Sequence, residues 1–93
     1  FEAHPEVSFR EMAGEPLPYA KKTWSGQGRR RELLAKHGIV LPDHLGPAGQ
    51  APPDDILDAA AVAWTAHRMA TGTARSHPSP PEELGGAPIA IWF

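Results

Sequence analysis

The clearest periodic pattern in the chain lies between residues 54 and 71. Apolar and half-apolar side chains recur there at the spacing of one helix face: Ile56, Ala60, Ala63, Trp64 and His67. Asp54 is a good N-cap residue, acidic side chains in the first turn suit the positive end of the helix dipole, and Gly72 can end the helix. Alanines surround most of this helix, so we expect it to pack closely on a sheet or between other elements.

Two further helical segments are expected nearer the N-terminus. Residues 25–37 favour a helix, and Gly38 sits where a left-handed residue commonly ends one. The apolar stripe of this helix is short: Leu33 and Leu34. A shorter helical turn is expected to begin at Ser8, because Ser8 precedes Glu11 at the capping-box spacing.

Short extended segments are expected at both ends of the chain. Residues 1–4 favour a strand that ends at the following proline, and residues 89–93 favour a largely buried strand. Proline and glycine concentrate in 14–18, 42–53 and 73–87, which we therefore expect to be loops. The order of strand, helices and strand predicts an α/β or α+β fold. Because two strands far apart in sequence make a poor sheet alone, we expect further strands from a longer protein or from a partner.

Composition limits the classes of protein to consider. The 93 residues are enough for one small domain, and 41% hydrophobic and 22% charged residues are typical of a globular chain. The formal net charge of −2 gives no general attraction to nucleic acid. The chain has no cysteine, which excludes disulfides and cysteine-based zinc sites and favours a reducing, cytoplasmic location. Its longest mostly apolar run falls short of the about 20 residues that a membrane-spanning helix needs, so we expect no membrane partner.

Three aspartates crowd the start of the expected long helix. An N-cap aspartate contributes about 1 kcal/mol to helix stability, which accounts for Asp54 and in part for Asp55. Asp58 lies one turn further along the same side, where like charges repel unless donors or cations offset them. The alternative is a metal site, because Mg²⁺ and similar hard ions take one or two carboxylates each. Glu2 in the first strand is then a candidate third ligand, and Glu6 is a weaker one. Both interpretations stay open at this point.

Other polar and aromatic residues are candidates for substrate contacts or for the core. His4 could act as a base or touch a substrate, or it could bond to backbone at the strand end. Lys21, Lys22 and Arg30 belong to the main basic concentration, which could bind phosphate or form a solvated helix face. The remaining histidines lack a zinc-binding spacing. The tryptophans are expected in the core or at an interface: Trp24, Trp64 and Trp92.

Four strings of the sequence, taken together, resemble one known family. They are FEAHPEVSFREMAG, PYAKKTWSGQGRRRELLAKHGI, DDILDAAAVAWTAHRMATGTA and PIAIWF. In this order, along nearly all of the chain, they resemble the C-terminal half of the domain-of-unknown-function family 429. The resemblance implies part of a ribonuclease-H-like fold, with a short strand, helices, a long alanine-rich helix and a C-terminal strand. Members of that family are predicted to be nucleases whose carboxylates bind two divalent metal ions.

The resemblance also implies roles for residues of this chain. Three carboxylates would be catalytic and would hold Mg²⁺ or Mn²⁺: Glu2, Asp55 and Asp58. Asp54 keeps the capping role. The lysine pair 21–22 matches a basic pair of the family, which has no assigned function. We keep four residues as candidates for substrate binding: His4, Lys21, Lys22 and Arg30.

The N-terminal half of the family, with its metal-anchoring aspartate, has no counterpart in these 93 residues. We therefore expect residues 1–93 to be a single domain or the C-terminal fragment of a larger one. The N-terminal portion of the same protein or a second copy would complete the sheet. The leading hypothesis is a metal-dependent nuclease that acts on nucleic acid and is inactive as the isolated chain. The alternative is a non-catalytic binding or structural module on the same scaffold. A helix-turn-helix DNA binder is disfavoured, because the connection between the helices is long and rich in proline.

Overall fold

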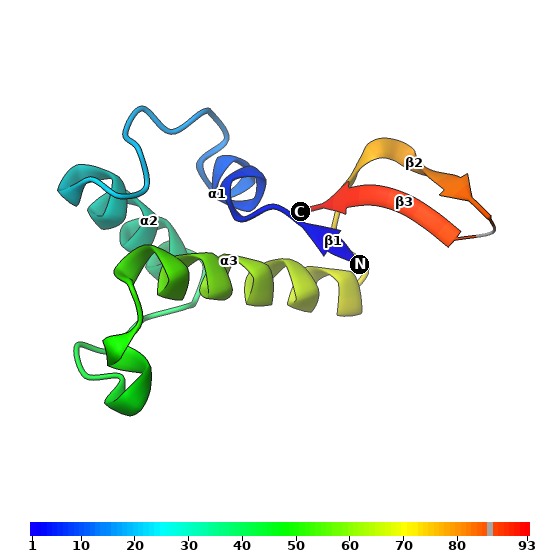
Figure 1. The fold of residues 1–93 in the computed structure, drawn as a ribbon. Helices are drawn as coiled ribbons and strands as arrows, with labels where there is room; N and C mark the ends of the chain where they lie inside the picture. The colour runs from blue at the N-terminus through cyan, green and yellow to red at the C-terminus, as the bar shows by residue number, and fades with distance from the viewer. Residues whose placement is uncertain (86) are drawn as a thin grey trace.

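The fold combines three α-helices with a small mixed sheet. The computed structural model describes residues 1–85 and 87–93. Within them the elements follow in this order (Figure 1): β1 (Glu2–Ala3), α1 (Pro5–Ala13), α2 (Trp24–Lys36), the 3₁₀-helix η1 (Gly46–Gln50), α3 (Pro53–Ala70), β2 (Ser76–Leu84) and β3 (Ala87–Trp92). The α/β class expected from the sequence is confirmed. No helix in this part of the chain has both the length and the apolarity needed to cross a membrane.

The sheet joins the two ends of the chain. Its strand order is β1-β3-β2, so that the first strand lies beside the last one (Figure 1). β1 runs parallel to β3, with Glu2 opposite Ile91, and β2 runs antiparallel to β3. Next to this ladder, Arg75 and Phe93 exchange two backbone hydrogen bonds of 2.7 and 2.9 Å. The N-terminal and C-terminal strands expected from the sequence are therefore both present, and they pair with each other.

β2 occupies a segment that we expected to be a loop, and that expectation is wrong. The strand contains three prolines: Pro78, Pro80 and Pro81. Proline has no backbone N–H to donate to a neighbouring strand. An edge strand tolerates it, because only one side of that strand is hydrogen-bonded to a neighbour. β2 lies at an edge of this sheet, and its pairing with β3 is irregular between His77 and Glu82, where the prolines lie.

α1 starts earlier than the expected helical turn. It begins at Pro5. Proline suits the first helical position, because the backbone N–H that it lacks would have no partner inside the helix anyway. The capping box expected at Ser8 is wrong, because the N-cap residue is His4 and Ser8 is buried inside the helix. The Ser8 hydroxyl lies 2.7 Å from the hydroxyl of Thr65 in α3. This buried hydrogen bond joins α1 to α3.

α2 and α3 lie close to the expected ranges. The N-cap of α2 is Thr23, and Gly38 follows its C-terminus with a φ of 92°. α3 begins at Pro53, so Asp54 lies in its first turn with no capping hydrogen bond, and the expected capping role of Asp54 is wrong. A proline at the first helical position has its φ already set for a helix, which moves the start ahead of Asp54.

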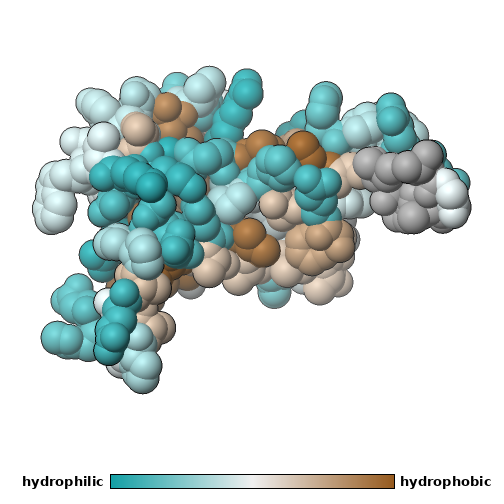
Figure 2. Space-filling view, viewed as in Figure 1, coloured by the Kyte–Doolittle hydropathy of each residue, from teal (hydrophilic) through white to brown (hydrophobic). Residues whose placement is uncertain are grey.

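The core lies between the three helices. Its buried side chains come from α1 (Phe9, Met12), α2 (Leu33, Leu34) and α3 (Leu57, Ala61, Trp64). This face of α3 differs from the expected stripe, since Ala63 and His67 are exposed. Ala61 is fully buried, and a side chain this small lets α3 lie close to its neighbours, as its alanine content suggested. In the view of Figure 2 the surface is largely hydrophilic, with apolar residues showing along α3.

Candidate functional site

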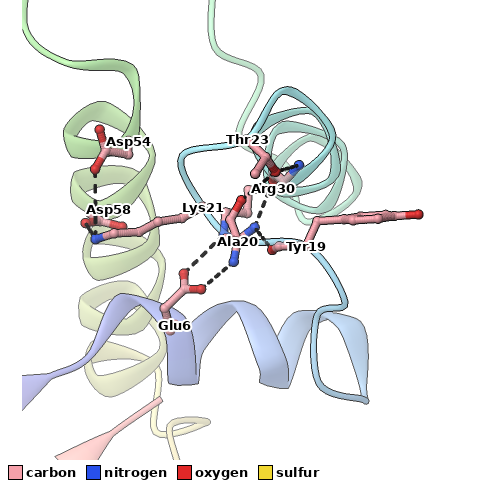
Figure 3. Close-up of polar contacts among 9 residues, drawn as sticks. Glu6, Tyr19, Ala20, Lys21, Thr23, Arg30, Asp54 and Asp58 are labelled. Carbon is pink, nitrogen blue, oxygen red and sulfur yellow. Dashed lines mark hydrogen bonds and ion pairs between the residues drawn. The ribbon is translucent and has the colours of Figure 1, made fainter.

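A lysine and two aspartates form the most concentrated polar cluster on α3. Asp54 and Asp58 lie four residues apart, so both face the same side of the helix. The Lys21 Nζ donates to Asp58 Oδ2 at 3.0 Å and lies 4.0 Å from Asp54 Oδ2 (Figure 3). The other oxygen of Asp58, Oδ1, is buried and has no hydrogen-bond partner within the described residues. The cluster is therefore one ammonium beside two carboxylates, with one acceptor left over.

The loop before α2 holds Lys21 in place through Thr23. The Thr23 Oγ1 donates to the Ala20 carbonyl at 2.8 Å and accepts from the Gly26 N–H at 2.9 Å. A Cβ at Gly26 would lie 1.8 Å from that same carbonyl oxygen, so only glycine allows the loop to approach α2 this closely. Residues 20–23 are thereby fixed on both sides of Lys21.

Arg30 attaches the same loop to α1 from inside the molecule. Its side chain is 2% exposed, and its Nη1 donates to the carbonyls of Tyr19 and Gly26, both at 2.9 Å. Its Nε donates to Glu6 at 3.1 Å and its Nη2 donates to the other Glu6 oxygen (Figure 3). The guanidinium carbon also lies 5.6 Å from the centre of the Phe9 ring. Arg30 therefore sets the position of Tyr19, two residues before Lys21, relative to both α1 and α2.

The charges around Lys21 keep its ammonium protonated at neutral pH. The hydrogen bond to Asp58, followed by the negative charge of Asp58, raises the pKa of Lys21 above its ordinary value. The charges of Asp54 and Glu6 act in the same direction, and partial desolvation opposes them. The site thus presents a permanent cation next to carboxylates.

The residues singled out from the sequence lie in several places. Glu2 in β1 and His4 directly after it are exposed, and His4 Nε2 lies 2.9 Å from Glu2 Oε1. Asp55 is exposed on α3, and Lys22 is exposed in the loop. Arg30 is buried and bound to Glu6, so it does not form the solvated face that the basic run suggested. From the predicted set the structure brings together two pairs, Glu2 with His4 and Lys21 with Asp58. It adds Asp54 to the second pair, for which the four-residue spacing was the available signal.

The acidic side chains of the cluster provide only part of the ligand set of a divalent cation. In the part of the chain that the structure describes, no three His, Asp or Glu side chains are close enough together to hold one metal ion. Glu2, Asp55 and Asp58 therefore do not converge here as one ligand set. Mg²⁺, however, is commonly bound by one or two carboxylates, with water and substrate phosphate as its other ligands. The unpaired Asp58 Oδ1, with Asp54 on the same face, fits such a partial ligand set.

These features define a mixed α/β domain with a carboxylate–lysine cluster. The family model described as Protein of unknown function (DUF429) matches residues 1–83, and the chain belongs to this family. The match covers all three α-helices and reaches into β2. No curated protein matches the chain. No solved structure matches it either.

Proposed function

We propose that this chain carries part of the active site of a metal-dependent nuclease, which hydrolyses phosphodiester bonds. The observation that supports this proposal is the carboxylate of Asp58. One of its oxygens accepts from Lys21, while the other is buried and has no hydrogen-bond partner among the residues that the structure describes. A buried acceptor that lacks a donor costs about 1–3 kcal/mol. Such an atom is readily explained if a bound ligand supplies the missing partner.

Each residue of the cluster has a role in this proposal. Asp58 and Asp54 would hold Mg²⁺ or Mn²⁺. The family resemblance also names Asp55 and Glu2, which are exposed and do not converge with Asp58 on one ion within the described residues. A bound divalent ion supplies an activated water and stabilises the leaving oxygen. Lys21, which stays protonated, would offset the negative charge of a phosphate next to Asp58.

The proposal extends to the architecture around the cluster. The parallel pair of β1 and β3 beside three helices would be the C-terminal half of a ribonuclease-H-like domain. The remaining strands would come from the N-terminal portion of the protein or from a second copy. They would also bring the metal-anchoring aspartate that the family resemblance implies. Full activity is therefore expected only where those strands are present.

The test is a cleavage assay with protein that includes the N-terminal portion, on labelled single-stranded, duplex and hybrid substrates in Mg²⁺ or Mn²⁺. Asp58→Asn should lower the metal-dependent rate by about 100-fold or more, because several kcal/mol of charge stabilisation are lost. Glu15→Gln is the matched control, since Glu15 is an exposed acid outside the cluster. Unchanged cleavage by Asp58→Asn would refute the assignment.

A non-catalytic role is the second candidate, and one observation favours it. The ion pair of Lys21 with Asp58 ties the loop before α2 to α3, which is a sufficient structural reason for both residues. On this alternative, Mn²⁺ leaves the melting temperature unchanged and Asp58→Ala is tolerated. A melting temperature that rises with Mn²⁺ in the wild type, but not in Asp58→Ala, would instead support the nuclease.

A further inference from the structure

Trp24 is the most exposed large hydrophobic residue among those described, with 91% of its surface accessible. We expected it in the core or at an interface, and a core position is wrong. It is the first residue of α2, directly after the capping Thr23 and two positions after Lys22. An exposed indole beside lysines is the combination with which proteins bind single strands, because the ring stacks on a base while the ammonium groups meet the backbone phosphates.

A groove of about 320 Å³ begins at Trp24 and continues between α2 and α3. Trp24, Gln27 and Arg31 line its α2 side at successive turns of the helix. Pro53 and Ile56, from the first turn of α3, line the opposite side. The segment that contains η1 also lines the groove. It projects from the helices next to the start of α3 (Figure 1). The volume lies at the low end of the range for small-molecule sites, which suits one flat ring system.

The polar groups of this groove suit the edge of a base. Gln27 carries an amide that can both donate and accept, and its side chain has no hydrogen bond to the residues that the structure describes. Arg31 is held only loosely, with its Nη2 at 3.6 Å from Asp43 Oδ1 and 3.4 Å from the Leu41 carbonyl. Apolar walls with a few polar groups at the rim would bind a base by its faces and its edge together.

The groove and the carboxylate–lysine cluster are neighbours along both elements that form them. On α3, Pro53 and Ile56 of the groove wall are close in sequence to Asp54 and Asp58 of the cluster, but they lie on a different face of the helix. On the other element, Lys21 reaches Asp58 while Trp24 follows three positions later. One strand would therefore have to pass around the first turn of α3 to place a base in the groove and a phosphate at the cluster.

We propose that this groove binds an unpaired base of a single-stranded nucleic acid, which stacks on Trp24. The inference rests on the proposed nuclease function, and it names the substrate as a strand with unpaired bases. Paired bases in a duplex are already stacked and cannot reach the indole unless they are flipped out at a cost. The overall charge of −2 also means that attraction to the strand is local, through Lys21 and Lys22.

The test measures binding separately from cleavage. The fluorescence anisotropy of a labelled oligothymidylate is followed with the purified protein in EDTA, with a duplex of equal length alongside. Trp24→Ala should weaken binding of the single strand about 10- to 100-fold, and Trp24→Phe should restore most of it because the ring still stacks. Val40→Ala is the matched control, since Val40 is 77% exposed and lies outside the groove. Both positions are exposed, so the fold should survive, and circular dichroism checks this.

The outcomes separate this inference from the proposed function. Binding of the strand that depends on Trp24, without cleavage in any metal when the N-terminal portion is present, would support the groove and refute the nuclease. Cleavage that depends on Asp58, with equal binding by the wild type and Trp24→Ala, would support the nuclease and overturn the groove. Equal binding of single strand and duplex would also overturn it. The groove proposal would also be overturned if Trp24→Ala lost self-association while its binding of the single strand stayed unchanged. The indole would then contact a second copy of the protein.

Discussion

Replacing Glu6 by methionine should destabilise the protein more than replacing Arg30 by methionine, although Arg30 makes more hydrogen bonds than Glu6. Arg30 makes four hydrogen bonds, two to Glu6 and two to carbonyls, whereas Glu6 receives only two. Counting contacts would therefore make Arg30→Met the more harmful change. Burial argues the reverse, because the Arg30 side chain is 2% exposed and the Glu6 side chain is 49% exposed.

The magnitudes follow from what each variant leaves behind. Glu6→Met leaves a buried guanidinium with two carbonyl acceptors, and breaking a buried pair from one side costs about 3–5 kcal/mol. We expect the lower value, about 3 kcal/mol, because those two carbonyl bonds survive. Arg30→Met frees a half-exposed carboxylate that returns to water, while the flexible methionine refills most of the space. Removing the guanidinium also removes its desolvation cost, so we expect a loss of about 1 kcal/mol.

Thermal unfolding followed by circular dichroism can separate the two variants. For a domain of this size each kcal/mol shifts the melting temperature by about 4–8 °C, so the expected decreases are about 12–24 °C for Glu6→Met and about 4–8 °C for Arg30→Met. The double variant should resemble Arg30→Met, because no buried charge remains. If Arg30→Met is as destabilising as Glu6→Met or more so, the reasoning from burial is refuted.

Two matched pairs test the loop and its lysine. Gly26→Ala should destabilise the protein by about 3 kcal/mol or more, because its Cβ would clash with backbone. Gly28→Ala has open space around it and should stabilise the protein by about 0.5–1 kcal/mol. Urea unfolding measures both, and equal effects would contradict the close approach of the loop to Gly26. Because the folded-state pKa of Lys21 is raised, its pairing stabilises the protein below the ordinary lysine pKa of about 10.4 and loses this effect as the pH rises through the folded value. The melting temperature of Lys21→Met should therefore lie below that of the wild type at neutral pH and converge with it above that range. Lys22→Met, at an exposed neighbour, should show no such convergence, and a constant difference for Lys21→Met would count against the ion pair with Asp58.

Local signals predicted the helices better than the strands. Residues 25–37 were predicted as a helix with Gly38 after its end, and α2 spans Trp24–Lys36, so both bounds were right to within a residue. β2 was missed, because its three prolines are compatible with a strand only at a sheet edge, and an edge position is a property of the whole fold. Asp54 was assigned as the cap because its residue type fits, but the neighbouring proline at the first helical position decides where α3 begins.

The contacts that form the candidate site join residues far apart in the chain, so the sequence did not predict them. Lys21 and Asp58 are 37 positions apart, and no local pattern connects them. Arg29, Arg30 and Arg31 have the same chemistry in sequence, yet only the middle one turns inward, toward a glutamate 24 positions away. The exposure of Trp24 was equally hidden, because a helix start can face either the core or the solvent.

The pairing of β1 with β3 also affects the order in which the molecule assembles. Glu2 and Ile91 come from opposite ends of the chain, so closing that pair before anything else is ordered costs about 4 kcal/mol of chain entropy. The core cluster, in contrast, is formed by residues 9–64, all of them on the three helices. Once the helices have packed, β1 is attached directly to the start of α1 and β3 is connected to the end of α3 through β2, so the remaining loop to be closed is short. The sheet is thus expected to form on a helical subdomain that already exists, and to be the first part of the molecule to open.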